Sequence, residues 1–244
     1  MTDPLVLIHG LGLTQALWDP YVAPLRAAGL KVLTYDLPGH GAAAPLDQDL
    51  SLDILADQLL DFLDEHEVAK AHLVGFSLGG MINRKVALKA RARVASLTIW
   101  NSPHDRGEAQ QAAVEARAKA SSGLGPGATL EAALQRWLTD QADPALRETI
   151  RAWRRGCHGR SYAQTAWVLA HGVRELTAGP HPVGLPTLIM TCEHDVGSTP
   201  AMAQAIARDL RAPAPQLVPG LRHLGLLERP EAFLGPLLAF VQDL

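Results

Sequence analysis

The stretch Val74-Gly75-Phe76-Ser77-Leu78-Gly79-Gly80 places one hydroxyl between glycines, directly after an apolar run. Residues 71–76 are predicted to form a buried strand and residues 78–88 a helix, so Ser77 falls at the turn between them. A sharp strand-to-helix turn strains the backbone and leaves little room, which favours glycine on both sides. Such a turn lifts the hydroxyl out of the sheet and aims a helix N-terminus at the group it attacks. The stretch therefore indicates a nucleophilic serine, with a glycine-rich turn and an ordinary capping serine as the alternative.

Short apolar runs alternate along the chain with longer amphipathic runs, which is typical of a parallel sheet covered by helices. The apolar runs show little polar alternation, as expected when both faces of a strand are buried. The predicted strands are Pro4–Ile8, Lys31–Tyr35, Ala71–Phe76, Val94–Trp100, Pro186–Thr191 and Gln216–Val218. The predicted helices between them are Leu17–Ala28, Ser51–Glu65, Leu78–Ala90, Pro200–Leu210 and Pro230–Gln242. This order predicts an α/β fold with a mostly parallel sheet of about six strands.

The alternation breaks between about residues 103 and 182, where no convincing strand is found. This segment instead contains four predicted helices, at Glu108–Ala120, Leu130–Thr139, Ala145–Arg155 and Tyr162–Ala170. We expect residues 1–102 and 183–244 to form the α/β core. Residues 103–182 are expected to form a helical cap over one end of the sheet.

The composition limits the partners of the chain. Its 244 residues are 48% hydrophobic and 19% charged, which suits one large domain with a sizeable core. The formal net charge of −3 argues against general nucleic-acid binding, which requires a basic surface. Met1-Thr2-Asp3-Pro4 leads straight into an apolar strand without a basic or a long apolar segment. We therefore expect no secretory signal and no membrane span, and a cytoplasmic location.

Metal and cofactor motifs are missing from the sequence. The two cysteines, Cys157 and Cys192, lack the spacing of a metal site or a CxxC pair. No zinc or phosphate-loop motif occurs either. We expect no metal and no cofactor.

A serine hydroxyl is a poor nucleophile until a base removes its proton, so Ser77 requires a histidine and an orienting carboxylate. Parallel α/β folds build their sites at the carboxyl ends of the strands. Asp195 lies just beyond the fifth predicted strand, and His223 lies between the last strand and the last helix. The order Ser77, Asp195, His223 is the order expected around a nucleophile elbow.

These motifs together resemble the α/β-hydrolase superfamily over nearly the whole chain. The matching residues are His9-Gly10, Asp36-Leu-Pro-Gly-His-Gly41, the Ser77 elbow, Glu193-His-Asp195, and His223 with Glu228-Arg-Pro. The resemblance implies an oxyanion hole made by the backbone N–H groups of Leu11 and Leu78.

The resemblance also bears on the order of the strands. The chain starts almost directly on the strand that usually comes third in the superfamily. We therefore expect six parallel strands in the spatial order second, first, third, fourth, fifth, sixth, without a leading antiparallel pair. The second strand then lies near an edge, which leaves the oligomeric state open.

Other histidines and carboxylates compete for the catalytic roles. His9 and His40 are expected to be structural, because such loops use histidine to bond backbone groups. His194 is a weaker rival base, since neighbouring residues on an extended segment point apart. Asp36 also follows a strand, but the resemblance assigns it to the organisation of the next loop and leaves Asp195 as the triad acid.

A serine nucleophile points to acyl transfer, whereas aspartate at that position would indicate dehalogenation or epoxide opening. We expect a serine hydrolase that acts on a small-molecule carboxylic ester or lactone through an acyl-enzyme. The sequence is most similar to the 3-oxoadipate enol-lactonase-like and small carboxylesterase group. Alternatives are a carrier-protein-linked methyl ester esterase, a C–C hydrolase and a cofactor-free perhydrolase. A ligand receptor or signalling protein with the hydrolase fold is the alternative that is not an enzyme.

The predicted cap supplies candidates for substrate binding. Arg151 and Arg154 lie broadly on one face of a predicted helix and are expected to bind an acidic group of the substrate. Trp137, Trp153 and Trp167 are expected to line the apolar part of the pocket. The alternatives are a solvated face for the arginines and core packing for the tryptophans.

Overall fold

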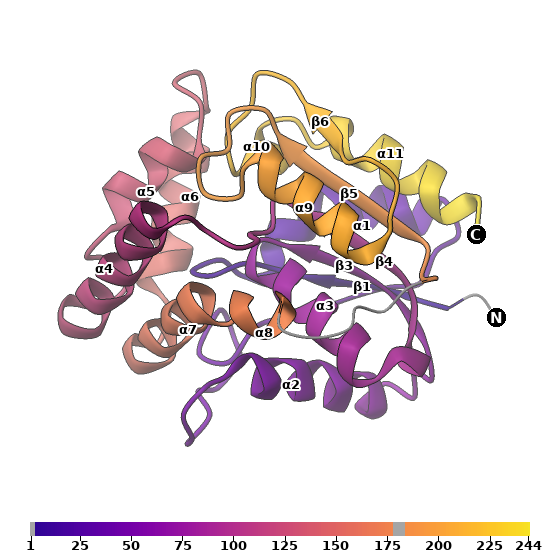
Figure 1. The fold of residues 1–244 in the computed structure, drawn as a ribbon, viewed down its shortest axis with the longest axis horizontal. Helices are drawn as coiled ribbons and strands as arrows, with labels where there is room; N and C mark the ends of the chain where they lie inside the picture. The colour runs from indigo at the N-terminus through magenta and orange to yellow at the C-terminus, as the bar shows by residue number, and fades with distance from the viewer. Residues whose placement is uncertain (1–2, 178–183) are drawn as a thin grey trace.

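The computed structural model describes residues 3–177 and 184–244 and shows an α/β fold (Figure 1). Its sheet has six strands in the order β2-β1-β3-β4-β5-β6, and all five pairings between neighbouring strands are parallel. The predicted strand order is therefore confirmed. The strands are β1 Leu5–Ile8, β2 Val32–Tyr35, β3 Ala71–Phe76, β4 Val94–Trp100, β5 Thr187–Cys192 and β6 Gln216–Val218.

The helices of the α/β part begin where the sequence offers capping side chains. The hydroxyl of Ser51 accepts a hydrogen bond from the Ile54 N–H at 3.2 Å, and Thr199 caps the helix that starts at Pro200 in the same way. These caps satisfy N–H groups that the first helical turn leaves unpaired. The helices are α1 Asp19–Ala27, α2 Leu52–Glu65, α3 Leu78–Lys89, α9 Pro200–Leu210, α10 Gly225–Glu228 and α11 Glu231–Gln242, with short 3₁₀ turns at Gln15–Trp18 and Arg91–Arg93.

Two hydrophobic cores lie on the two faces of the sheet. Val6 and Ile8 of β1 face the core that contains residues of α2, α3 and α9. Leu5 and Leu7 face the opposite core, which contains residues of α1 and α11. Because successive strand residues point to opposite faces, a strand buried on both sides must be apolar throughout. This requirement explains the uninterrupted apolar runs of the sequence.

Five helices lie between β4 and β5 in the described part of the chain, and we call α4 to α8 the helical insert. They gather beside the carboxyl ends of the strands (Figure 1). Four were predicted, and the short α8 was not. The division into a core and a cap domain stays a prediction. The insert consists of α4 Glu108–Leu124, α5 Leu130–Trp137, α6 Pro144–Arg155, α7 Gly159–His171 and α8 Val173–Thr177.

Within the described ranges, no helix combines the length and apolar content that crossing a membrane would require.

The turn between β3 and α3 has the strained backbone that the glycine pattern predicts. Ser77 has φ 54° and ψ −111°, a backbone conformation that residues other than glycine rarely adopt. A β-carbon on Gly75 would clash with the backbone of Gly79, and a β-carbon on Gly79 would clash with the carbonyl oxygen of Ile8. Both glycines are needed because backbone fills the space that a side chain would occupy.

We expect Gly79→Ala to destabilise the fold by more than about 2 kcal/mol, because backbone atoms of β1 cannot move aside as a side chain would. Gly123→Ala in α4 is the matched control, since a β-carbon there meets no atom within 4 Å. The control should be neutral or stabilise by up to about 1 kcal/mol. Urea unfolding of both variants measures the difference, and equal stabilities would contradict the packing argument.

Candidate active site

Ser77 is anchored on both sides by the chain that leaves β4. Its N–H donates to the carbonyl oxygen of Trp100 at 2.9 Å, and its own carbonyl accepts from the Ser102 hydroxyl at 2.8 Å. The buried guanidinium of Arg84 donates in turn to Ser102 and to the carbonyl oxygen of Pro103. The serine is thus fixed to the end of β4 and to the loop that follows it.

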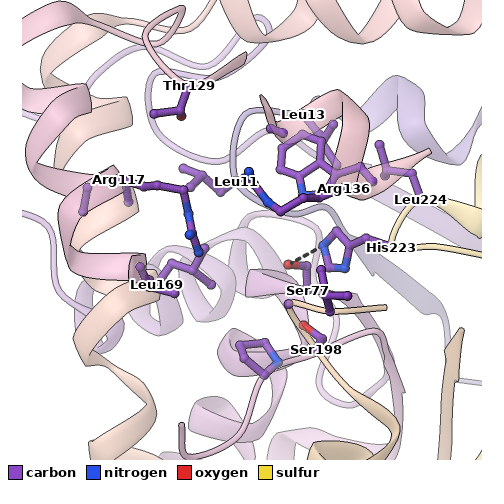
Figure 2. Close-up of a pocket in the computed structure, with 18 of the residues that line it drawn as sticks. Leu11, Leu13, Ser77, Arg117, Thr129, Arg136, Leu169, Ser198, His223 and Leu224 are labelled. Carbon is purple, nitrogen blue, oxygen red and sulfur yellow. Dashed lines mark hydrogen bonds between the residues drawn. The ribbon is translucent and has the colours of Figure 1, made fainter. Parts of the chain in front are cut away.

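The structure brings Ser77, His223 and Asp195 together from three separate loops. The Nε2 atom of His223 lies 3.2 Å from the Ser77 hydroxyl oxygen (Figure 2). The Nδ1 atom of the same ring lies 2.6 Å from an Asp195 carboxylate oxygen. The three side chains form one continuous series of hydrogen bonds at the carboxyl edge of the sheet.

Every lone-pair direction of the Asp195 carboxylate is used. One oxygen accepts from His223 and from the Asn101 side-chain amide at 2.8 Å, and the other accepts from the backbone N–H groups of Gly197 and Ser198 at 2.8 and 2.9 Å. Burial by itself raises the pKa of Asp195, but the attraction to His223 and these hydrogen bonds outweigh it and lower the pKa below its usual value. The carboxylate therefore stays ionised in a buried position.

Asn101 was not recognised from the sequence. It follows β4 directly, so its place at the carboxyl edge of the sheet is the one signal that the sequence contains. Its backbone has φ 45°, a region in which asparagine is tolerated better than most residues. This conformation accompanies the hydrogen bond from its amide group to the Asp195 carboxylate.

The backbone after β1 runs directly beside Ser77. A β-carbon on Gly10 would lie only 3.1 Å from the β-carbon of Ser77, so glycine permits the close approach. Leu11 follows Gly10 and lines the pocket. Leu78 is the first residue of α3, on the other side of Ser77 in the chain.

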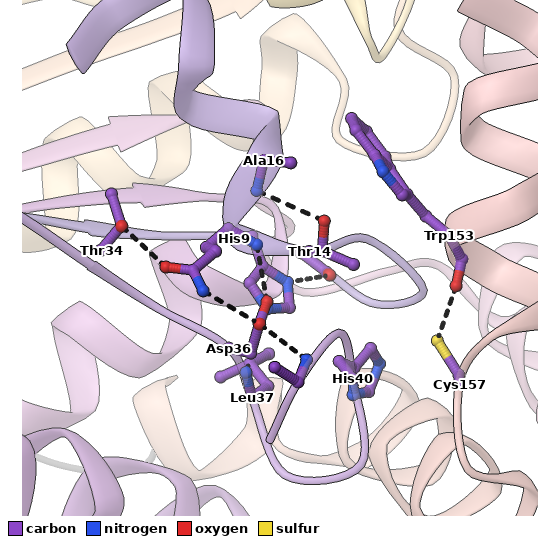
Figure 3. A network of polar contacts seen from close by, with 12 residues as sticks. His9, Thr14, Ala16, Thr34, Asp36, Leu37, His40, Trp153 and Cys157 are labelled. Atoms are coloured by element: carbon purple, nitrogen blue, oxygen red, sulfur yellow. Dashed lines mark hydrogen bonds and ion pairs between the residues drawn. The ribbon is translucent and has the colours of Figure 1, made fainter.

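A polar network joins the loops after β1 and β2 (Figure 3). Asp36 accepts hydrogen bonds from the Gln15 N–H at 2.7 Å and from the Ala42 N–H at 3.0 Å. The Nε2 atom of His9 accepts from the Leu37 N–H at 3.0 Å, so the proton of this ring sits on Nδ1 and the ring is neutral. Asp36 and His9 thus support the loop that carries Leu11.

His40 is buried in the same network. Its Nδ1 atom lies 3.1 Å from the carbonyl oxygen of Pro38. Burial lowers its pKa to about 3, with a further contribution from the neighbouring His9. Burial also lowers the pKa of His9. Both rings bond backbone groups, as predicted from the sequence, whereas the rival base His194 lies exposed on the surface.

A pocket of about 110 Å³ opens above Ser77 and His223. The helical insert supplies nearly half of the lining residues, and most of the others come from the carboxyl end of β3 and from the loops after the strands (Figure 2). The wall is mixed in character. Its apolar side chains include Leu11, Leu13, Phe76, Val114, Trp137, Leu169 and Leu224, and its guanidinium groups come from Arg106, Arg117, Arg136 and Arg154.

Two of the five residues predicted to bind substrate line this pocket. The Trp137 ring lies 5.9 Å from the His223 ring, between centroids. The Arg154 guanidinium is buried 5.5 Å from the Trp137 ring centroid and 5.0 Å from that of Tyr162. It donates to the carbonyl oxygen of Pro126 and to the Thr129 hydroxyl, so Arg154 is held firmly within the wall.

The other three predicted residues are not among the side chains that line the pocket. Arg151 reaches the carboxylates of Glu131 and Glu148 on the outer surface, at 2.6 and 2.5 Å. Trp153 packs against the core beneath α6. Trp167 is 45% exposed and stacks on His171. Helical periodicity predicts which residues share one face of a helix, but not what packs against that face. The prediction that these three side chains line the pocket is therefore wrong.

Arg117 of α4 and Arg136 of α5 line the pocket and were missed from the sequence. Arg136 stands next to Trp137, which is the only local signal. Arg117 lies in a polar helix without a distinctive pattern.

The fold and the hydrogen-bonded Ser-His-Asp arrangement define the class of α/β hydrolases. A model of the alpha/beta hydrolase family matches residues 5–235, and the chain belongs to this family. The resemblance found in the sequence is therefore confirmed.

Among curated proteins, the chain is similar to 3-oxoadipate enol-lactonase 1 of Acinetobacter baylyi, with 28% identity over 98% of this chain and 89% of the relative. It is also similar to (E)-2-((N-methylformamido)methylene)succinate hydrolase of the same organism, with 26% identity over 94% of this chain and 86% of the relative. Among solved structures, a hydrolase from Pseudomonas aeruginosa superposes with a TM-score of 0.85 at 27% identity, over 98% of this chain and 90% of that one.

The described residues contain no group of three or more histidine, cysteine, aspartate or glutamate side chains arranged to hold a metal ion.

The two buried histidines predict a loss of stability in acid. An unfolded histidine takes up a proton near pH 6.5, whereas native His40 does so only near pH 3. Between these values the unfolded state binds more protons, so the free energy of unfolding should fall by up to about 1.4 kcal/mol per pH unit for each such histidine. Urea unfolding at pH 7.5, 6.5, 5.5 and 4.5 measures this slope.

His40→Asn should be less stable at neutral pH but should show a shallower slope, because one titrating group is removed. His66→Gln, at an exposed position, is the control and should keep the slope of the natural sequence. A slope that His40→Asn leaves unchanged would show that His40 does not control the acid response.

Proposed function

We propose that this chain is a serine hydrolase that cleaves a carboxylic ester or lactone through an acyl-enzyme. The observation that carries the proposal is the continuous hydrogen-bonded series from Asp195 through His223 to Ser77, which ends in an open pocket. Each role in acyl transfer has a side chain of the right chemistry in reach.

In the first half of the reaction, the Ser77 oxygen attacks the carbonyl carbon while Nε2 of His223 takes the hydroxyl proton. The tetrahedral intermediate then collapses, the bond from carbon to the leaving oxygen breaks, and His223 returns the proton to that oxygen. With a lactone the leaving oxygen stays in the same molecule as the acyl group. In the second half, His223 removes a proton from a water molecule whose oxygen attacks the acyl carbon. The bond from that carbon to the Ser77 oxygen then breaks, His223 returns the proton to Ser77, and the acid is released.

Asp195 acts through His223. Its hydrogen bond fixes the proton of the neutral ring on Nδ1, which leaves Nε2 free to act as the base. When the ring takes the serine proton, the buried carboxylate stabilises the resulting positive charge. The other three donors to Asp195 hold the carboxylate in place for both tasks.

The backbone N–H groups of Leu11 and Leu78 are proposed to bind the oxyanion. The close approach of Gly10 to Ser77 and the position of Leu78 at the start of α3 support this role. Two fixed donors stabilise the transition state by about 3–4 kcal/mol each in comparable sites. The network of Asp36 and His9 keeps the first of these loops in place.

The relatives support an ester or lactone substrate. The names of the two Acinetobacter relatives describe an enol-lactonase and a hydrolase of a substituted succinate, and another relative, from Vibrio vulnificus, is a pimeloyl-[acyl-carrier protein] methyl ester esterase. A lactone or an ester is the target in two of these three names. We propose a substrate of the same general class for this chain.

Ser77→Ala should lower kcat/KM on 4-nitrophenyl esters of short acids by at least about 1,000-fold, because the variant lacks the nucleophile. The fold should persist, since alanine retains the backbone of the turn. Ser122→Ala, on the exposed part of α4, is the matched control and should keep full activity. A fluorophosphonate probe should label Ser77 alone, as read by peptide mass spectrometry. Unchanged turnover in Ser77→Ala would refute the mechanism, and an inert natural protein that binds a ligand tightly would favour a receptor.

Asp195→Asn should lower kcat by about 100- to 10,000-fold with little change in KM, because the carboxamide cannot stabilise the charged ring. Gln110→Ala serves as a control at the surface near the same loop, where its side chain donates to the carbonyl oxygen of Val196. Steady-state kinetics of both variants on one ester decide the matter. A kcat within threefold of the natural value would remove Asp195 from the mechanism.

A further inference from the structure

Two guanidinium groups face the pocket without a protein partner. Arg117 reaches it from α4 and Arg136 from α5, both from the side of the helical insert (Figure 2). Within residues 3–177 and 184–244, neither side chain makes a hydrogen bond or an ion pair. Each guanidinium therefore presents five N–H donors to the pocket or to water.

Two other arginines of the insert, Arg154 and Arg151, differ in this respect. Arg154 is buried and donates to Pro126 and Thr129, and Arg151 forms ion pairs with two glutamates outside the pocket. These contacts explain both side chains structurally. Among the described residues, Arg117 and Arg136 have no comparable contacts.

The pocket holds no free carboxylate that would neutralise them. Among the described residues that line it, Asp195 is the only acidic one. Both of its oxygens are already occupied by His223, Asn101 and two backbone N–H groups. The two positive charges are left for a ligand to balance.

Their surroundings make an anion favourable. Both side chains are half-buried, and this burial lowers the pKa of each guanidinium. The charges of Arg117 and Arg154 lower the pKa of Arg136 further, which means that like charges lie close together at low solvent exposure. A bound carboxylate would relieve this repulsion and would accept paired hydrogen bonds in the planar geometry that guanidinium offers.

The geometry points to a carboxylate-binding subsite formed by Arg117 and Arg136 on the insert side of the pocket, whose lining also includes the apolar side chains of Leu11 and Leu169. The inference rests on the proposed function and specifies its substrate class: an ester or lactone whose acyl part carries a second, ionised carboxyl group. The pocket volume of about 110 Å³ suits a short acyl chain.

The test compares two esters with the same acyl chain length, 4-nitrophenyl hexanoate and the mono-4-nitrophenyl ester of hexanedioic acid. They differ in the terminal carboxylate. We expect the natural protein to favour the acidic ester, and Arg117→Gln or Arg136→Gln to lower the acidic-to-neutral ratio of kcat/KM by at least about 10-fold. Activity on the neutral ester should fall less than activity on the acidic ester, because the neutral ester has no carboxylate for the guanidinium to bind.

Two further sets of variants separate charge from geometry. Arg117→Lys and Arg136→Lys keep the charge but lose the planar fork, so they should retain part of the preference. They also keep the test valid if a glutamine variant does not fold, as judged by circular dichroism and thermal melting. Lys119→Gln removes the same charge from an exposed position of α4 and should leave the ratio unchanged.

The failure of this inference is distinct from failure of the proposed function. If the natural protein hydrolyses both esters and its ratio stays within threefold in both glutamine variants and in their double variant, the subsite is refuted and the hydrolase stands. If neither ester is cleaved, the proposed function fails for such substrates, and calorimetric titration with hexanedioate then decides the subsite. Binding that both glutamine variants abolish supports it, and absence of binding to the natural protein overturns it.

Discussion

The strained backbone of Ser77 is the constraint on which the rest of the site depends. Its positive φ costs on the order of 1–3 kcal/mol, and the surrounding structure must hold it in place. The hydrogen bond to Trp100, the Ser102 hydroxyl and the glycines on either side do so. A site with this support needs little rearrangement when a substrate arrives, and this pre-organisation is the main source of electrostatic catalysis.

The acidic and the basic side chains of the pocket differ in their hydrogen-bond partners. The carboxylate of Asp195 is buried and bonded by four donors, so it acts only on the ring of His223. The guanidinium groups of Arg117 and Arg136 are exposed to the pocket. The buried carboxylate thus serves the catalytic histidine, whereas the guanidinium groups of Arg117 and Arg136 are accessible to a ligand in the pocket.

Much of the fold and the reacting residues could be predicted because local chemistry determines them. Strands buried on both faces must be apolar, and a serine at a tight strand-to-helix turn must be flanked by glycine. Asp195 and His223 each follow a strand, and parallel strands bring such positions to one edge. None of these inferences requires knowledge of how distant helices pack.

The pocket wall could not be predicted in the same way, because tertiary contacts decide it. Arg151 and Arg154 lie three residues apart on one helix, yet Arg151 meets glutamates at the surface and Arg154 lies between aromatic rings. Arg117 lies in a helix whose polar sequence is typical of a solvent-exposed helix. The periodicity of a sequence describes the faces of one helix, whereas the lining of a pocket depends on how several helices pack together.

All three reacting side chains and both proposed oxyanion amides come from outside the helical insert, which lies between β4 and β5 in the chain. Substitutions at the pocket face of α4 therefore alter which molecule fits without touching the reacting residues, whereas α5 also bonds the loop of His223 through the carbonyl oxygen of Trp137. Natural variation and laboratory selection can therefore change the substrate range and the catalytic residues through different parts of the chain. New substrate ranges can arise from this chain through a few changes in one continuous segment, while the machinery for acyl transfer is inherited intact.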